Sequence, residues 1–313
     1  MQVKGNIAAL FSNYALLLND LNRYEDALLN YERSIAIEPD FAVAYCNLGL
    51  MLENLGRTNE AVRYYNYAIN INGNYLEAHF RLGFLYRNIN DLSNSLTSYD
   101  QVLAIKSDYV DALNNRGTVL KDMGRIEEAA QNFEAAIAIK PDNEDVLYNY
   151  ARLLLLIGDF KRGWLKYEWR KKLKEPMGNR TFPKPLWLGK EEIENKTILI
   201  HHEQGLGDTI QFCRYIKFLS QKGANVLFAP QFQLKKLMSS LSSSCRIIDL
   251  SSNIPAFDFH CPLLSLPVAL GANSYEIPVD VPYLSADVEV IEKWQERIGR
   301  SGFKIGICWQ GST

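Results

Sequence analysis

Asparagine recurs along the first half of the chain at a spacing that could hold a peptide. Asn13, Asn47, Asn115 and Asn149 fall on one 34-residue register, and Arg81 takes the remaining position. A primary amide offers two N–H donors and one acceptor oxygen, so it can pair with both polar groups of a peptide bond. A row of these amides could therefore bind an extended chain by its backbone. The alternative is that asparagine simply faces water at this position.

The segment HHEQGLGDTIQFCRY, residues 201–215, could bind an anion or supply a general base. Gly205 and Gly207 permit a tight turn and a close approach of the backbone to a ligand. The amides of residues 208–210 would begin a helix, and such amides bind anions. Asp208 could accept a proton from a hydroxyl as a general base, or it could cap the helix. The segment lacks G-x-G-x-x-G and the P-loop lysine, which argues against a dinucleotide or nucleoside-triphosphate site.

The asparagines belong to a longer repeat. Small, aromatic and proline residues share further 34-residue registers, which is the tetratricopeptide signature. It predicts pairs of antiparallel helices over residues 8–41, 42–75, 76–109 and 110–143, with an altered fifth unit over 144–172. The residues that carry the signature are Gly49, Gly83 and Gly117; Ala27, Ala61 and Ala129; Tyr31, Tyr65, Tyr99 and Phe133; and Pro39 and Pro141.

Such units stack into a superhelix with a concave groove, because one unit cannot bury its apolar face alone. In the third unit, Phe80, Phe84 and Arg87 would form an apolar and basic patch in the groove, or they pack in the ordinary way. The fifth unit is rich in aromatic residues, among them Trp164 and Tyr167. We expect it to be a cap whose outer face docks on the next domain, since terminal repeats are usually atypical.

From residue 173 the helical period stops. Residues 173–190 form a linker rich in proline and glycine. Short apolar runs then alternate with amphipathic helices, which predicts a parallel sheet covered on both faces. In such a sheet the ligand crevice lies beyond the carboxyl ends of the strands, where residues 201–215 would lie. The expected strands are Thr197–His202, Asn225–Ala229, Arg246–Leu250 and Phe257–His260, and the expected helices are 208–221 and 232–241. The fold class is thus an α-solenoid followed by an α/β domain.

Composition excludes several classes of protein. Among 313 residues, 34 Lys and Arg balance 36 Asp and Glu, so no basic field exists to hold a nucleic acid. No apolar run approaches the length of a membrane span, and the start lacks a signal peptide's apolar stretch. The five cysteines are scattered, which argues against a disulfide framework or a zinc site and fits a cytoplasmic protein. His201, His202 and His260 hold no motif position, and we expect them to be structural.

The motifs EQGLGDTIQFCRY, DFHCPLLSLP (258–267), PYL (282–284) and IGICWQGS (305–312) carry a family resemblance. The chain resembles bacterial tetratricopeptide proteins with a family 9 or family 41-like glycosyltransferase domain. The order of parts is similar to that of the nucleocytoplasmic O-linked N-acetylglucosamine transferase. The resemblance implies a superhelix over 1–172, a Rossmann-like first lobe of a GT-B fold over 191–284, and the start of a second lobe over 285–313.

The same resemblance implies an inverting, metal-independent transfer from a nucleotide-sugar donor, with no cofactor bound by this chain alone. Asp208 matches the proposed base of heptosyltransferases, and Gly205, Gly207 and Thr209 beside it are expected to bind the donor phosphates. Gly311 and Ser312 match the loop that approaches the donor phosphates. The rest of the second lobe, which supplies most of the nucleotide pocket, is missing, so the chain looks truncated and inactive alone. The alternative is a tetratricopeptide scaffold for protein–protein interaction with a non-catalytic α/β domain.

Overall fold

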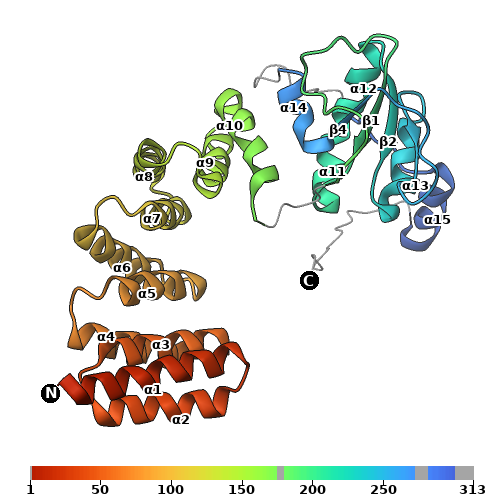
Figure 1. The fold of residues 1–313 in the computed structure, drawn as a ribbon. Helices are drawn as coiled ribbons and strands as arrows, with labels where there is room; N and C mark the ends of the chain where they lie inside the picture. The colour runs from red at the N-terminus through yellow and green to blue at the C-terminus, as the bar shows by residue number, and fades with distance from the viewer. Residues whose placement is uncertain (1, 175–179, 272–280, 300–313) are drawn as a thin grey trace. The chain divides into compact units, whose positions relative to one another are not determined.

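The fold was analysed in a computed structural model that describes residues 2–174, 180–271 and 281–299, with side chains from residue 6 onward. The chain divides into two compact units, Met1–Leu153 and Leu154–Thr313. Helices make up the first unit, and the second contains a small sheet (Figure 1). The domain boundaries expected from the sequence, with the array ending at residue 172, remain predictions.

The first unit is a series of antiparallel helix pairs. Each expected repeat contains two helices joined by a short turn, and the two helices of a pair make the most extensive contacts in the unit. The helices are α1 (Gln2–Asp20), α2 (Tyr24–Ile37), α3 (Ala42–Asn54), α4 (Thr58–Ile71), α5 (Leu76–Asn88), α6 (Leu92–Ile105), α7 (Val110–Asp122), α8 (Ile126–Ile139) and α9 (Glu144–Leu156). The predicted helical solenoid is therefore confirmed.

The small and aromatic registers pack directly on each other inside each pair. A Cβ added at Gly83 would lie 2.8 Å from the ring of Tyr99, and one at Gly49 would lie 2.9 Å from the ring of Tyr65. Both tyrosine side chains are fully buried. The first helix therefore needs a glycine at these positions, because the aromatic ring of the second helix fills the space where a methyl group would stand.

We expect Gly83→Ala to lower the free energy of unfolding by about 1 to 3 kcal/mol, since the methyl group would overpack the buried Tyr99 ring. Gly73→Ala is the matched control. A Cβ at Gly73 would meet no atom within 4 Å. Urea unfolding followed by circular dichroism measures both variants. Equal stability of the two variants would show that the close approach does not matter.

The second unit is built on four parallel strands. These are β1 (Thr197–His201), β2 (Asn225–Ala229), β3 (Arg246–Ile247) and β4 (Phe259–Pro262), in the order β3-β2-β1-β4. Ile200 in the central strand pairs with Phe228 on one side and Cys261 on the other. All four strands lie where the sequence predicts them. β3 is shorter than expected because the Asp249 carboxylate accepts hydrogen bonds from the backbone and hydroxyl of Ser251, which turns the chain.

The other helices that the structure describes in the second unit precede, connect or follow the strands. They are α10 (Phe160–Tyr167), η1 (Glu168–Lys172), α11 (Leu206–Phe212), α12 (Arg214–Gln221), η2 (Phe232–Leu234), α13 (Lys235–Met238), η3 (Ser239–Leu241), η4 (Leu263–Ser265), α14 (Leu266–Ala269) and α15 (Val288–Ile298). Among the helices that the structure describes, none has the length and apolar character needed to cross a bilayer.

The two faces of the sheet are covered differently. Ile198 and Ile200 pack in the large core cluster with α12 residues such as Ile216. Leu199 and Leu227 point to the other face, where irregular segments supply the cover. The residues packed against that face are Phe182, Leu250, Ile254 and Phe257. Both faces are therefore buried, as predicted, although only one of them lies under helices.

Candidate functional site

The first helices of successive repeats form a continuous surface in the first unit. α1 contacts α3, α3 contacts α5, and α5 contacts α7. The asparagine register lies on these helices, with Asn13 exposed and Asn47, Asn115 and Asn149 half-buried. The predicted row is thus present on one set of helices, with one member in each unit except the third.

Two of the asparagines link neighbouring repeats. The Asn47 side-chain amide donates to Ser12 Oγ at 3.4 Å, and the Asn149 amide donates to Asn114 Oδ1 at 3.1 Å. In both cases the partner lies 35 residues earlier. Each amide keeps a second N–H donor and its carbonyl oxygen, since a primary amide has two donors and one acceptor. The side chains are therefore held in place without using up the groups that a peptide bond would need.

The one basic residue of the row is held by acids. Arg81 Nε donates to Glu77 Oε1 at 2.7 Å, and its Nη1 lies 4.0 Å from Glu53 Oε1. Glu53 also accepts a hydrogen bond from the Tyr65 hydroxyl at 2.7 Å. The charge of Arg81 is therefore neutralised by the neighbouring carboxylates. As a result, the centre of the asparagine row is not strongly basic.

The residues of the apolar and basic patch expected in the third unit do not all face solvent. Phe80 packs against Tyr99 and Tyr109, with ring centroids 5.8 Å and 5.4 Å apart, so it belongs to the core. Phe84 remains 41% exposed and available to a partner. Arg87 Nη2 pairs with Asp122 Oδ2 at 3.0 Å. The surface offers one apolar side chain here and one basic group that is already paired.

The loop after β1 and the start of α11 contain the catalytic and phosphate-binding residues expected in the second unit. Asp208 Oδ2 accepts a hydrogen bond from the backbone N–H of Gly205 at 3.1 Å. Thr209 is buried, and its backbone N–H points to the Gly205 carbonyl oxygen at 3.3 Å, which makes this amide a poor donor to an anion. Asp208 therefore makes the capping contact that the sequence left open. Its role as a base remains a prediction.

The two glycines of this loop are not required by the fold. Neither Gly205 nor Gly207 has a positive φ. A Cβ at Gly207 would meet no atom within 4 Å. The tight turn expected from the sequence is thus made without any special backbone conformation, and open space lies beside Gly207. Gly311 and Ser312 lie outside the described residues, as do residues 300–313 of the expected second lobe.

A buried ion network holds the loop in place. The Arg170 guanidinium is 2% exposed and donates to Glu203 Oε2, Glu168 Oε1 and Ser265 Oγ, each at 2.8 Å. Burial alone would raise the pKa of Glu168, but Arg170 and Lys171 hold this pKa below its ordinary value. The network ties η1 and η4 to the residue that precedes Gln204, and so fixes the position of the loop.

Three histidines lie in or directly after strands β1 and β4: His201 ends β1, His202 follows it, and His260 lies within β4. The rings of His201 and His260 both pack against Phe182 in a tilted arrangement, and each centroid lies 4.9 Å from that of Phe182. Burial lowers the pKa of His201 to about 3, so its ring is neutral. Arg180 donates to His202 Nε2 at 2.9 Å, which makes this nitrogen an acceptor and leaves the proton on Nδ1, 3.0 Å from the Ala229 carbonyl oxygen. Burial also lowers the pKa values of His202 and His260, and the structural role expected of the three rings remains a prediction.

Comparison with protein families identifies the first unit. Residues 15–56 match a family model described as TPR repeat, and residues 120–163 match one described as Tetratricopeptide repeat. A further Tetratricopeptide repeat model matches 42–75 and 76–109, the same bounds that the sequence period predicts. The helical array is made of tetratricopeptide repeats. These matches lie within residues 15–163 and bear on the array alone. No curated protein matches the chain.

Several solved structures are similar to about half of this chain. MamA from Desulfovibrio magneticus RS-1 is 17% identical over 54% of this chain and 97% of that chain, with a TM-score of 0.49. YrrB, described as a TPR protein with an unusual peptide-binding site, is 19% identical over 52% of this chain and 84% of its own, with a TM-score of 0.46. PilF of Pseudomonas aeruginosa is 15% identical over 53% and 76%, with a TM-score of 0.48.

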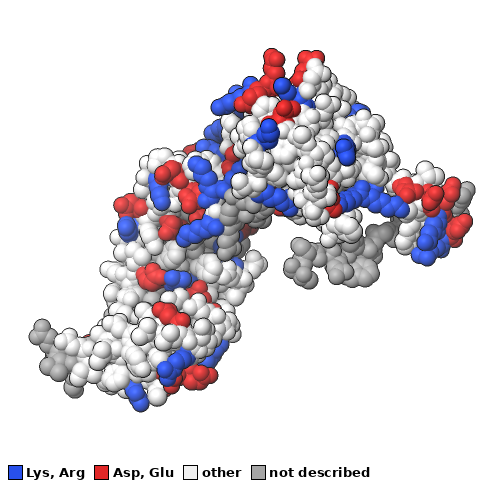
Figure 2. Space-filling model, turned by 45° about the vertical axis from the view of Figure 1, so that its right-hand side comes forward, with Lys and Arg blue, Asp and Glu red and all other residues white. Residues whose placement is uncertain are grey.

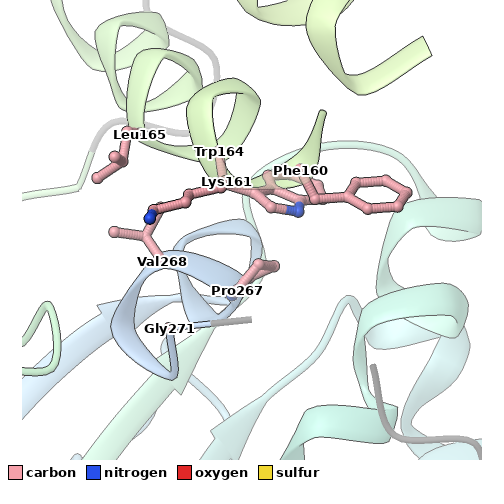
Figure 3. Close-up of a pocket in the computed structure, with 7 residues that line it drawn as sticks. All are labelled: Phe160, Lys161, Trp164, Leu165, Pro267, Val268 and Gly271. Carbon is pink, nitrogen blue, oxygen red and sulfur yellow. The ribbon is translucent and has the colours of Figure 1, made fainter. Parts of the chain in front are cut away.

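The second unit has an apolar cavity of about 220 Å³ between α10 and α14. Figure 3 shows Trp164 and its neighbours on α10 facing Pro267 and Val268 of α14. Trp164 also packs edge-on against Phe212, with ring centroids 5.5 Å apart. The aromatic side chains of α10 therefore dock on elements of the sheet unit. Sequence patterns did not predict the cavity, because its two walls are about 100 residues apart in the chain.

Acidic and basic side chains are mixed on the face of the repeats that Figure 2 shows. Within the described ranges, no three His, Cys, Asp or Glu side chains gather where they could hold a metal ion. What the array offers a partner is hydrogen-bonding capacity along its first helices and a few exposed apolar side chains.

Proposed function

We propose that the chain is a protein-interaction scaffold and that the first helices of its tetratricopeptide array bind an extended peptide. The observation that carries this proposal is the row of half-buried amides at Asn47, Asn115 and Asn149. Asn47 and Asn149 are each oriented by a hydrogen bond to the preceding repeat and keep one donor and one acceptor available. Because the asparagine amides recur at one position of the repeat, they suit an extended peptide, whose backbone N–H and carbonyl groups also recur at regular intervals.

The composition of the surface favours contacts with the peptide backbone over recognition of charge. Arg81 is occupied by Glu77 and Glu53, and Arg87 by Asp122. A strongly acidic peptide would therefore find few free cations along the first helices. Phe84 provides one apolar contact in the third unit. We expect partners to be extended segments with little net charge and an apolar side chain near the centre.

To test this proposal, a library of short random peptides is screened for binding to the full chain. Peptides that bind are then measured by fluorescence anisotropy against the double variant Asn47→Ala with Asn115→Ala. Loss of two to four hydrogen bonds should weaken binding about tenfold or more. The control is Asn59→Ala with Asn70→Ala, which removes two exposed asparagines from the second helix α4. Unchanged binding by the Asn47 and Asn115 variant, with its fold intact, would refute the proposal.

A second candidate function concerns the sheet unit. The parallel order β3-β2-β1-β4 places the loop 202–205 at the carboxyl end of a central strand, where α/β sheets bind ligands. Asp208 and the open space beside Gly207 lie directly after that loop. We propose on this basis that the unit is a Rossmann-like first lobe of a glycosyltransferase, with Asp208 as the base.

The glycosyltransferase candidate is tested by incubating the full chain with radiolabelled nucleotide sugars and a bacterial lysate as the source of acceptors. Transfer that disappears in Asp208→Asn but persists in Asp287→Asn supports it. Equal transfer by both variants contradicts the assignment of Asp208. Peptide binding by the array does not depend on either result.

A further inference from the structure

The first helix of the array carries an exposed apolar stripe. Ile7, Leu10, Tyr14, Leu17 and Leu21 are 40%, 66%, 48%, 54% and 60% exposed. Their spacing alternates between three and four residues, so four of them lie along one side of α1 and Leu21 lies just past its end. Single exposed leucines are ordinary on protein surfaces, but a contiguous stripe of this length marks an interaction surface.

The two central positions of this stripe, those of Tyr14 and Leu17, are buried in the following repeats, whereas the position of Leu21 stays exposed there, as at Leu55, which is 37% exposed. Leu48 and Met51 of α3 occupy the positions of Tyr14 and Leu17 one repeat later, and they are 0% and 1% exposed. Leu82 and Leu85 of α5, another repeat along, are both 3% exposed.

The cover in those repeats is the second helix of the preceding unit. α2 packs on α3, α4 on α5, and α6 on α7. Among the described residues no helix lies in this position on α1. The stripe is therefore a surface shaped to receive a helix, and in this structure it lacks one.

Two features favour a second copy of α1 as the occupant. The first is charge: no Asp, Glu, Lys or Arg stands between Gly5 and Asn19. Two copies can thus meet without repulsion between like charges, and the stripe offers no charge for a charged partner to match. The second feature is symmetry, since the stripe has Tyr14 at its centre and two aliphatic side chains on each side.

We infer that the chain forms a two-fold dimer through α1, with the two helices antiparallel. Tyr14 meets its counterpart at the axis, Leu10 lies near Leu17 of the second copy, and Ile7 lies near Leu21. A two-fold contact uses the same patch on both copies and closes on itself, so it yields dimers and no fibres. The pair would bury on the order of 1,000 Å² in total, which is the lower end for a specific interface. We therefore expect a dimer of about micromolar Kd.

Sedimentation equilibrium of the full chain over a concentration series tests the dimer. Leu10→Glu with Leu17→Glu should raise the dimer Kd at least about a hundredfold, because four carboxylates would be buried at the contact. Leu29→Glu is the control, since Leu29 is 45% exposed on α2 and outside the stripe; its Kd should stay unchanged. A wild-type chain that remains monomeric, or a dimer that persists in the double variant, overturns the inference.

Cross-linking tests the two-fold geometry separately. Tyr14→Cys should give a covalent dimer under mild oxidation, since the two thiols would face each other at the axis. Leu29→Cys should not, and it also controls for the native cysteines. A dimer that is lost in the glutamate variant but cannot be linked through Tyr14→Cys would contradict the antiparallel arrangement. Neither result depends on peptide binding at the asparagine row.

Discussion

Replacing Arg170 by alanine should lower the free energy of unfolding of the sheet unit by about 3 to 5 kcal/mol. The guanidinium donates to Glu203, Glu168 and Ser265, each at 2.8 Å. The Glu203 side chain is only 3% exposed. The variant would leave this carboxylate buried without its cation, and an uncompensated buried charge costs more than the pair itself contributes.

Urea unfolding followed by tryptophan fluorescence measures the effect, because Trp164 and Trp187 both lie in or against the core of the sheet unit. Lys236→Ala is the control. Lys236 also pairs with a carboxylate, Asp287 at 3.1 Å, but its side chain is 72% exposed. We expect no measurable change in the control, since solvent screens such pairs. Similar small effects in both variants would show that the Arg170 network does not hold the loop.

Acidification should destabilise the sheet unit through His201. Burial lowers the pKa of this ring to about 3 in the folded chain, whereas an unfolded histidine titrates near 6.5. Between these values the unfolded chain binds a proton that the folded chain does not. The stabilisation is fully present above about pH 6.5 and falls by about 1.4 kcal/mol for each pH unit below it.

The contribution of His201 is isolated by comparing the wild-type chain with His201→Phe, which keeps a ring against Phe182 and His260. Unfolding free energies measured from pH 7 to pH 4 should converge, with the variant losing about 3 kcal/mol less than the wild type over this range. Burial also lowers the pKa values of His202 and His260. Because both chains retain these two rings, the difference reports on His201. Parallel pH profiles would contradict the account.

The array could be predicted from the sequence almost in full, because each repeat makes the same packing contacts. In every unit that carries both registers, the glycine and the aromatic residue are 16 residues apart, as Gly83 and Tyr99 are. The 34-residue period therefore reveals their contact directly. The strands were also predictable, since a buried parallel strand such as β1 is a short apolar run. Such patterns are local or periodic, and both kinds are visible in one sequence.

The features that position the site were not predictable. The buried Arg170 pairs with Glu203 and Ser265, which lie 33 and 95 residues later in the chain. No period connects such residues, so only the fold brings them together. The two interpretations of Asp208 were equally open for a related reason, since a helix cap and a general base require the same residue at the same place. The structure shows the capping contact.

The central claim, that the array binds a peptide by its backbone, is tested most directly by altering the peptide. A bound peptide from the library would be scanned twice, once with N-methyl groups on successive backbone amides and once with alanine at successive side chains. N-methylation removes the donor that an asparagine carbonyl oxygen would accept. We expect several N-methyl positions to weaken binding about tenfold or more, and most alanine positions to change it little. Binding that tolerates N-methylation throughout and depends on the side chains would contradict the claim.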